Sequence, residues 1–304
     1  MNYPWLEPDD PRLSMTREEV ITNHLKFKDT MLTTEQQEEI RNIVPEYNEA
    51  FSTHSEIGCL HDFEIHLQTK KDFKPFIQRP YPIATAHFDR VRKEIKNLIA
   101  QGVIERGKAI CYTARFVQPK PESNSLRLIA DLRSLNHQLV VSHHPLISRP
   151  ELHVKLATQR NTQFLTTLHF TNAFCSLQLD EESRQLLGLN IASFTGLRLT
   201  RLPMGSSISL SVWCECLAQV LSGVTGERDL SMYCDDLIIS SKNYTSHKEN
   251  LRTTLERMAQ SGLKLNLTKS QFGARCTKIL GFLYTVTEDG LRISIPQSKI
   301  DTAK

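Results

Sequence analysis

A chain of 304 residues, 39% hydrophobic and 23% charged, is neither fibrous nor wholly disordered, and it has apolar material for about two domains. The 37 Lys and Arg against 34 Asp and Glu leave a net charge of +3, which permits a nucleic-acid partner without demanding one. The seven cysteines are odd in number and scattered, so they support neither a disulfide framework nor a structural zinc site and favour an intracellular compartment, cytoplasmic or nuclear.

The first 60 residues are expected to be a lead segment with one short helix. They contain no signal peptide, and no later run approaches the roughly 20 apolar residues of a membrane span, so we expect a soluble protein with no membrane partner. Thr34 and Gln37 have the spacing of a capping box. This spacing predicts a helix that carries Ile40, Ile43 and Val44.

A strand, an extended segment and a helix are predicted next. Alternating polar and apolar residues predict a strand over 63–67, and two prolines predict an extended segment over 78–82. A helix is predicted from 86 to 101, with Gly102 in the position after its end. The apolar side chains of this helix share one stripe: Phe88, Val91, Ile95, Leu98 and Ile99.

Two strands joined by a loop are predicted over 113–117 and 126–136. Lys120, Arg127 and Arg133 lie in or beside this loop. Two interpretations of these cations remain open: they contact phosphate groups, or they are ordinary charges on a solvated loop.

The second half of the chain continues with alternating strands and helices. The sequence predicts a β-rich run over 165–179, a strand over 193–201, a turn over 202–205 and a buried helix over 207–221. A further helix over 246–260 ends before Gly262, and its apolar stripe contains Leu251, Leu255 and Met258.

Between these two helices, residues 230–240 place adjacent Asp235 and Asp236 between two strand-forming runs, which predicts a half-buried hairpin. Two ionised carboxylates side by side repel each other and lose hydration there unless a cation lies between them. A divalent metal site is therefore one interpretation, and an ordinary polar hairpin tip is the other.

Several motifs follow one another in a fixed order along the chain. They are Lys120 and Arg127 with Asp131–Asn136, Leu168–Phe174, Leu202–Gly205, Tyr233–Asp236, Gly262–Phe272 and Ile279–Phe282. With this order and spacing, residues from about 60 to 300 resemble the reverse transcriptase of gypsy-type LTR retrotransposons and, more distantly, retroviral reverse transcriptases.

The resemblance implies an α+β fold, a right-hand polymerase with an antiparallel palm sheet, a YxDD hairpin and surrounding helices. It implies fingers at about 78–140 and 177–207, palm at about 141–176 and 208–288, and a truncated thumb or connection that begins at 289–304. The chain would then be the polymerase part of a pol polyprotein.

The implied activity is RNA-directed DNA synthesis, in which dNTPs are added to a primer on an RNA or DNA template by two-metal phosphoryl transfer. Asp235, Asp236 and the backbone carbonyl of Phe170 match the metal ligands, with two Mg²⁺ expected and Mn²⁺ as the alternative. The implied dNTP-binding residues are Lys120, Arg127, Ala173, Phe174, Met204 and Lys269. Phe174 matches the aromatic residue that excludes a ribose 2′-hydroxyl, and Leu280 and Gly281 match the start of the primer grip.

His169 stands where the family has its first catalytic aspartate. A neutral imidazole is a poor ligand for Mg²⁺, and facing Asp235 and Asp236 a protonated His169 would form an ion pair in the space meant for the metal. A histidine with no role in a decayed copy is the other interpretation. Leu210 and Ser270 also differ from the Pro and Cys that the family usually has.

Two hypotheses follow. The chain is an active RNA-directed DNA polymerase, or it is a catalytically inactive remnant that at most binds nucleic acid or a protein. His169 distinguishes them, because loss of a metal-bridging ligand removes a large catalytic contribution. The oligomeric state stays open.

Overall fold

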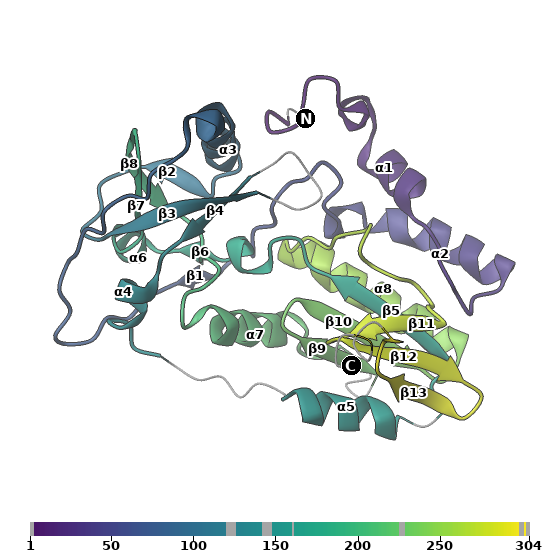
Figure 1. The fold of residues 1–304 in the computed structure, drawn as a ribbon. Coiled ribbons are helices and arrows are strands. Elements are labelled where there is room, and N and C mark those ends of the chain that lie inside the picture. The colour runs from purple at the N-terminus through teal and green to yellow at the C-terminus, as the bar shows by residue number, and fades with distance from the viewer. Residues whose placement is uncertain are drawn as a thin grey trace. The chain divides into compact units, whose positions relative to one another are not determined.

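The computed structural model describes residues 3–119, 126–141, 148–159, 161–224, 229–297 and 301. The chain divides into two compact units, and each unit is built from segments far apart in the sequence. Unit 1 comprises Met1–Leu13, Glu56–His144 and Asn172–Glu215. Unit 2 comprises Ser14–Ser55, Pro145–Thr171 and Cys216–Lys304. Figure 1 shows the elements of both units.

A five-stranded sheet with the order β2-β8-β7-β3-β4 is the centre of unit 1. Strands β3 and β7 are parallel, and the other neighbours are antiparallel. The strands are β2 (Ile104–Arg106), β3 (Tyr112–Pro119), β4 (Leu126–Ala130), β7 (Gly188–Ile191) and β8 (Phe194–Leu199). A separate parallel pair is formed by β1 (Glu64–Ile65) and β6 (Gln178–Leu179), so the strand expected over 63–67 is short.

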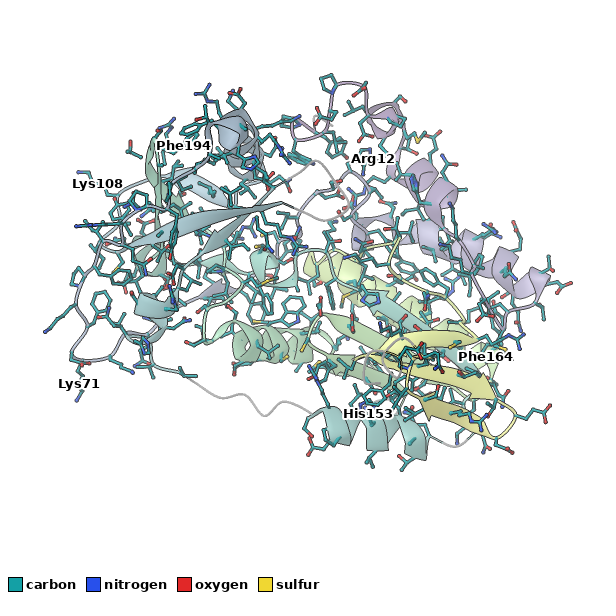
Figure 2. All side chains as sticks on the ribbon, in the orientation of Figure 1. Arg12, Lys71, Lys108, His153, Phe164 and Phe194 are labelled. Carbon is teal, nitrogen blue, oxygen red and sulfur yellow. The ribbon has the colours of Figure 1, made fainter. Side chains whose placement is uncertain are left out.

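The helices of unit 1 include one that the sequence predicted well. They are η1 (Pro11–Ser14), η3 (Thr85–His87), α3 (Phe88–Ala100), α4 (Arg133–Asn136), η4 (Ala173–Ser176), α6 (Glu181–Gln185) and the start of α7 (Ser209–Val220). In α3, Val91 and Ile95 are buried, and Phe88 stacks on Phe194 of β8 with ring centroids 6.3 Å apart (Figure 2). Ile99 is exposed instead of buried, because it lies about 80° around the helix from Val91.

The second strand predicted over 126–136 is shorter than expected. Strand β4 ends at Ala130, and residues 133–136 form α4. An Asp131 oxygen accepts a hydrogen bond from the backbone N–H of Arg133 at 3.3 Å. Such a local side-chain bond offers the backbone an alternative to the strand ladder, which explains why the strand stops there.

An antiparallel sheet with the order β5-β10-β9 is the centre of unit 2. Its strands are β5 (Phe164–His169), β9 (Leu230–Tyr233) and β10 (Asp236–Ser241), so the predicted hairpin is confirmed. Helix α8 (Tyr244–Ser261) packs against β10 and ends at Gly262, whose φ of +79° favours glycine. The predicted stripe of α8 is buried, and no helix within the described ranges is long and apolar enough to cross a membrane.

A second antiparallel sheet of unit 2 packs against α5 (Arg149–Thr158). Its strands, in the order β11-β12-β13, are β11 (Cys276–Ile279), β12 (Phe282–Thr287) and β13 (Gly290–Ser294). Figure 2 shows His153 on α5, and its ring lies edge-on to Phe282 with centroids 4.6 Å apart. The core joins this sheet to β5 and β10 through Leu152, Leu156, Leu165, Ile238, Ile279, Tyr284 and Val286.

The amino-terminal part of unit 2 has more structure than the sequence suggested. It contains α1 (Arg17–His24), α2 (Thr34–Glu46) and η2 (Asn48–Ala50). The capping box of α2 is Thr33 with Gln36, one residue before the predicted Thr34 and Gln37. Both pairs have the same spacing, so only the packing of the helix chooses between them. Salt bridges join α2 to α8, from Lys248 to Glu39 at 2.7 Å and from Arg252 to Glu46 at 3.1 Å.

Candidate functional site

The hairpin between β9 and β10 presents its two carboxylates at a tight two-residue loop. Tyr233 pairs with Asp236, so Cys234 and Asp235 form the loop. Cys234 has a φ of +52°, a left-handed value that costs free energy for a residue other than glycine. Burial raises the pKa of the Cys234 thiol, and the charges of Asp235 and Asp236 raise it further. The thiol therefore stays protonated beside the carboxylates at neutral pH.

His169 lies at the end of β5, opposite Asp236 in the antiparallel register. Its Nδ1 atom contacts Oδ1 of Asp236 as an ion pair or hydrogen bond, depending on the protonation of the ring. The two side chains are 28% and 18% exposed, so the pair is partly open to solvent. The sequence-based expectation that His169 faces the hairpin carboxylates agrees with this contact.

Backbone hydrogen bonds hold the strand end beside the hairpin. The N–H of Phe170 donates to the carbonyl of Asp235 at 3.0 Å. The N–H of Asn266 donates to the carbonyl of His169 at 2.7 Å, and the N–H of His169 donates to the Ser270 hydroxyl at 3.3 Å. The positions of His169 and Phe170 are thus set by the hairpin and by the segment around residues 266–270.

The side chains as placed do not form a complete magnesium site. Asp235 and Asp236 are hard oxygen donors of the kind that Mg²⁺ prefers. However, His169 already contacts Asp236, and an imidazole suits zinc, copper or nickel better than magnesium. Within the described part of the chain, no group of three or more His, Cys, Asp and Glu side chains is placed to hold a metal ion.

The residues predicted to bind the nucleotide fall in both units. Lys120 lies outside the described residues. Unit 1 contains Arg127, Ala173, Phe174 and Met204, and unit 2 contains Lys269 together with the predicted primer-grip residues Leu280 and Gly281. The structure thus brings together His169, Phe170, Asp235 and Asp236 within unit 2. The other described residues of the predicted site are divided between the two units.

In unit 1, Arg127 is exposed on β4, opposite Gln118 of β3. Phe174 lies two residues after Asn172, whose φ of +51° is in the left-handed region. The Phe174 ring lies edge-on to Trp213, with ring centroids 6.4 Å apart. Met204 is 74% exposed in its turn. An aromatic ring anchored on a buried tryptophan and an exposed methionine offer apolar surface to a ligand on this unit.

Arg133 is held by Asp131 instead of being left for a phosphate. Its Nε and Nη2 atoms donate to the two carboxylate oxygens at 2.9 and 2.6 Å. Hydrogen bonds from Arg133, opposed by burial, hold the pKa of Asp131 well below its usual range. Arg133 is therefore engaged by a carboxylate of the protein itself.

In unit 2, Lys269 is exposed, and its backbone N–H donates to the Asn266 side chain at 3.1 Å. Leu280 and Gly281 join β11 to β12 as a two-residue loop with φ values of +52° and +81°. Two consecutive positive φ values match a type I′ turn, in which leucine at the first position is strained.

Comparison with known proteins decides the family. Residues 118–284, more than half of the chain, match the family profile of the reverse transcriptase (RNA-dependent DNA polymerase). The chain belongs to this reverse transcriptase family.

The relatives of this reverse transcriptase domain are long polyproteins. It is 26% identical to the Pol polyprotein of transposon 297 of Drosophila melanogaster, over 75% of this chain and 21% of that protein. It is 24% identical to the Pol polyprotein of transposon gypsy of the same fly, over 89% and 26%, and 26% identical to the Pro-Pol polyprotein of simian foamy virus type 3, over 90% and 23%. The chain thus spans about a quarter of the length of these relatives.

Solved structures show the same fold. The foamy viral protease-reverse transcriptase in complex with an RNA/DNA hybrid superposes with a TM-score of 0.78 at 19% identity, over 98% of this chain and 39% of that chain. The same viral protein in complex with double-stranded DNA gives 0.79 at 19% identity, over 99% and 51%. The α+β polymerase fold expected for this reverse transcriptase domain is confirmed.

Two residues of the reverse transcriptase domain, Asn136 and Ser270, have supporting roles that the sequence did not predict. The Asn136 amide donates to the carbonyl of Gly205 at 3.0 Å and accepts from the N–H of Ser207 at 2.9 Å, so it braces the turn that carries Met204. Ser270 holds the N–H of His169. Both belong to motifs that were recognised, but nothing local in the sequence shows which backbone groups they reach.

Proposed function

We propose that this chain is the polymerase part of a retrotransposon Pol polyprotein, which binds a primer on an RNA or DNA template and adds dNTPs to the primer end. The observation that carries the proposal is the register of β5 and β10, which puts the strand end at His169 and Phe170 against the Asp235–Asp236 hairpin. The resemblance to gypsy-type enzymes supports it, and so do the relatives named as Pol polyproteins. An intracellular location is part of the same proposal.

Unit 1 then supplies the fingers, and unit 2 supplies most of the palm. The proposed fingers at about 78–140 and 177–207 fall within unit 1, and most of the proposed palm falls within unit 2. Residues 289–304 would begin the thumb or connection. Solved structures of the same fold contain the foamy viral protein in complex with an RNA/DNA hybrid and with double-stranded DNA, which supports a duplex partner for this chain too.

Within this proposal, each nucleotide-site residue has a role set by its chemistry. Arg127, with Lys120 from the neighbouring loop, would neutralise the triphosphate, because guanidinium and ammonium groups pair well with phosphate oxygens. Phe174, backed by Trp213, would exclude a ribose 2′-hydroxyl. Exposed Met204 would contact the base or sugar, Lys269 the triphosphate, and the Leu280–Gly281 turn the primer strand.

Divalent ions are expected to assist phosphoryl transfer by stabilising the attacking and leaving oxygens. Asp235, Asp236 and the Phe170 carbonyl are the proposed ligands for Mg²⁺ or Mn²⁺. The contact between His169 and Asp236 supports a second candidate function, in which the domain binds primer and template but synthesises little or no DNA.

Primer extension on a primed RNA template distinguishes the two candidates. We expect little magnesium-dependent extension by the protein with His169, because the position lacks a hard ligand. His169→Asp is expected to raise the rate about 100-fold or more, as the return of a charge-stabilising group at a reaction centre does. The matched control adds Asp235→Asn to His169→Asp and is expected to abolish the gain.

Other outcomes have distinct meanings. Robust extension with His169 in place would exclude the binding-only candidate. No extension by His169→Asp, with primer-template binding that weakens as salt rises, would leave the binding-only function. Failure of both extension and binding would overturn the whole proposal.

A further inference from the structure

The segment 264–266 of unit 2 lies between two other pieces of chain. On one side, Leu265 pairs in parallel with Phe51, and both residues are fully buried. The N–H of Leu265 donates to the carbonyl of Ala50 at 2.7 Å, and the N–H of Ser52 donates to the carbonyl of Leu265 at 2.9 Å. Residues 50–52 of the amino-terminal part therefore form a short outer strand.

On its other side, the same segment pairs with the candidate catalytic strand. Leu265 bridges to Phe170 in the antiparallel sense. The N–H of Asn266 donates to the carbonyl of His169 at 2.7 Å, and the N–H of Thr171 donates to the carbonyl of Lys264 at 2.8 Å. Leu265 thus lies between two strands, residues 50–52 on the outer side and residues 169–171 on the inner side. The inner strand in turn bonds to the hairpin, through the Phe170 N–H and the Asp235 carbonyl.

Charged side chains fasten the outer strand to the central one. The Lys264 ammonium is 2.9 Å from a Glu49 carboxylate oxygen and also donates to the Glu49 carbonyl. Burial by itself would raise the pKa of Glu49, but the hydrogen bond and charge of Lys264 lower it below its ordinary value. Arg17 of α1 donates to the carbonyl of Phe51 at 2.6 Å. Only 11% of the Lys264 and Arg17 side chains is exposed, but the Glu49 side chain is 55% exposed. The bonds to the Glu49 and Phe51 carbonyls are therefore better shielded from water than the ion pair.

The amino-terminal part also contacts the chain about eight residues farther on, at Gly273 and Arg275. The N–H of Met31 and the hydroxyl of Thr30 donate to the carbonyl of Gly273 at 2.8 and 2.7 Å. The N–H of Arg275 donates to the carbonyl of Asp29 at 2.7 Å. A Cβ atom on Gly273 would lie 2.4 Å from the Leu32 side chain, so the approach is close. Residues 29–31 and 50–52 of the amino-terminal part therefore form hydrogen bonds with the two ends of the stretch 264–275, which includes Lys269 and Ser270.

We propose that residues 14–55 are a positioning element for the polymerase site, acting through the bridge 50–52, 264–266 and 169–171. This inference rests on the proposed function, because it concerns the same site. Farther along, Gln271 pairs with Thr167 of β5, which belongs to the sheet β5-β10-β9. At residues 264–266 the outer strand adds a second pairing partner, which limits the movement of the central strand and, with it, of the His169 carbonyl and Phe170. Ser52 and Lys264 are positioning residues, and a single substitution at either removes at least one bond of this bridge.

Ser52→Pro tests the outer strand, because it removes the N–H that donates to Leu265. Phe51 already has φ of −116° and ψ of 144°, the conformation that a residue before proline favours. Ser52→Ala is the matched control, since it keeps the N–H. In the His169→Asp background, we expect Ser52→Pro to raise the Mn²⁺ concentration needed for half-maximal extension about 5-fold, from the loss of about 1 kcal/mol, and Ser52→Ala to leave it unchanged.

A purely structural role would give a different result. Ser52→Pro would then lower the melting temperature and the active fraction, with the Mn²⁺ midpoint and the KM for dNTP unchanged, and that outcome overturns the proposal. If Ser52→Pro does not fold, Lys264→Met carries the same test, because it keeps the aliphatic stem and the backbone bonds but removes the ammonium.

A readout independent of activity separates this inference from the proposed function. If His169→Asp shows no extension, the proposed synthesis has failed, and hydrogen exchange of the Phe170 amide in the unmutated protein still tests positioning. That amide donates to Asp235. We expect it to exchange faster in Ser52→Pro than in Ser52→Ala at equal global stability. Equal exchange in the two variants would refute the positioning role.

Discussion

His247 on α8 of unit 2 and Arg115 on β3 of unit 1 are both almost completely shielded from solvent, with 0% and 6% exposure, but their polar atoms are treated differently. Both ring nitrogens of His247 have partners, the Thr166 hydroxyl at 2.8 Å and the Ser241 hydroxyl at 3.2 Å. The Nη1 atom of the Arg115 guanidinium donates a long bond to the carbonyl of Leu128 at 3.4 Å. Its Nε and Nη2 atoms have no hydrogen-bond partner among the described residues.

The difference shows that a buried ionisable group can be accommodated either as a neutral group or as a charged one. Burial lowers the pKa of His247 to about 4, so at neutral pH it is an uncharged ring with satisfied nitrogens. Burial also lowers the pKa of Arg115, to about 10, which still leaves it charged. Its electrostatic neighbour Cys175 has a pKa raised by burial and therefore carries no counter-charge. Unit 2 buries a polar group whose nitrogens have partners, and unit 1 buries a cation for which the described residues supply no counter-charge.

The largest expected effect is the loss of the His247 ring. His247→Leu removes one hydrogen-bond partner from each of two buried hydroxyls, those of Thr166 and Ser241. The two hydroxyls still accept from the Gly273 N–H and the Asn250 amide. At roughly 1.5 kcal/mol for each lost partner, we expect the free energy of unfolding of unit 2 to fall by about 3 kcal/mol, measured by urea denaturation followed by circular dichroism. Glu249→Leu, an exposed site on the same helix, is the control and is expected to change little. Equal effects of both substitutions would break the comparison.

Acid is expected to act on His247 almost as strongly. The unfolded chain takes up a proton below its ordinary pKa of about 6.5, whereas the folded protein does so only near 4. The contribution of His247 to stability is therefore present above pH 6.5 and is lost as pH falls, by about 3 kcal/mol at pH 4. The measurement is the unfolding free energy from pH 7 to pH 4. The unfolding free energy of the unmutated protein should fall more steeply with acid than that of His247→Leu, and the difference between the two slopes is the effect of His247 without that of the carboxylates. Identical slopes would contradict the assignment.

Arg115→Met is expected to stabilise unit 1 by about 2 kcal/mol. It replaces a buried charge, which has no counter-charge in the described part of the chain, with an apolar side chain of similar length. Both tryptophans, Trp5 and Trp213, belong to unit 1, so tryptophan fluorescence during urea unfolding reports on this unit. Arg106→Met on the same sheet is the exposed control, with a change below about 0.5 kcal/mol. Destabilisation by Arg115→Met would mean that the guanidinium has a partner in solution, and the contrast with His247 would disappear.

Several elements followed from the sequence because their signals are local. The stripes of α3 and α8 and the glycines after them, Gly102 and Gly262, lie within a few residues of the structure they determine. The hairpin was predicted for the same reason, since apolar runs flank the two aspartates. The ordered motifs identified the family, which in turn fixed the expected polymerase fold and the opposition of His169 and Asp236.

Other features were decided only by tertiary structure. The pairing of Phe51, Leu265 and Phe170 joins segments that are far apart in the chain and only a few residues long, so no periodicity reveals it. The shift of the α2 cap to Thr33 and the end of β4 at Ala130 depend on packing and on a side-chain bond to the backbone. The burial of Arg115 depends on which face of β3 is covered, and residue identity alone predicts exposure for arginine. Local signals determine elements, whereas long-range contacts decide which side chains those elements bury and hold in place.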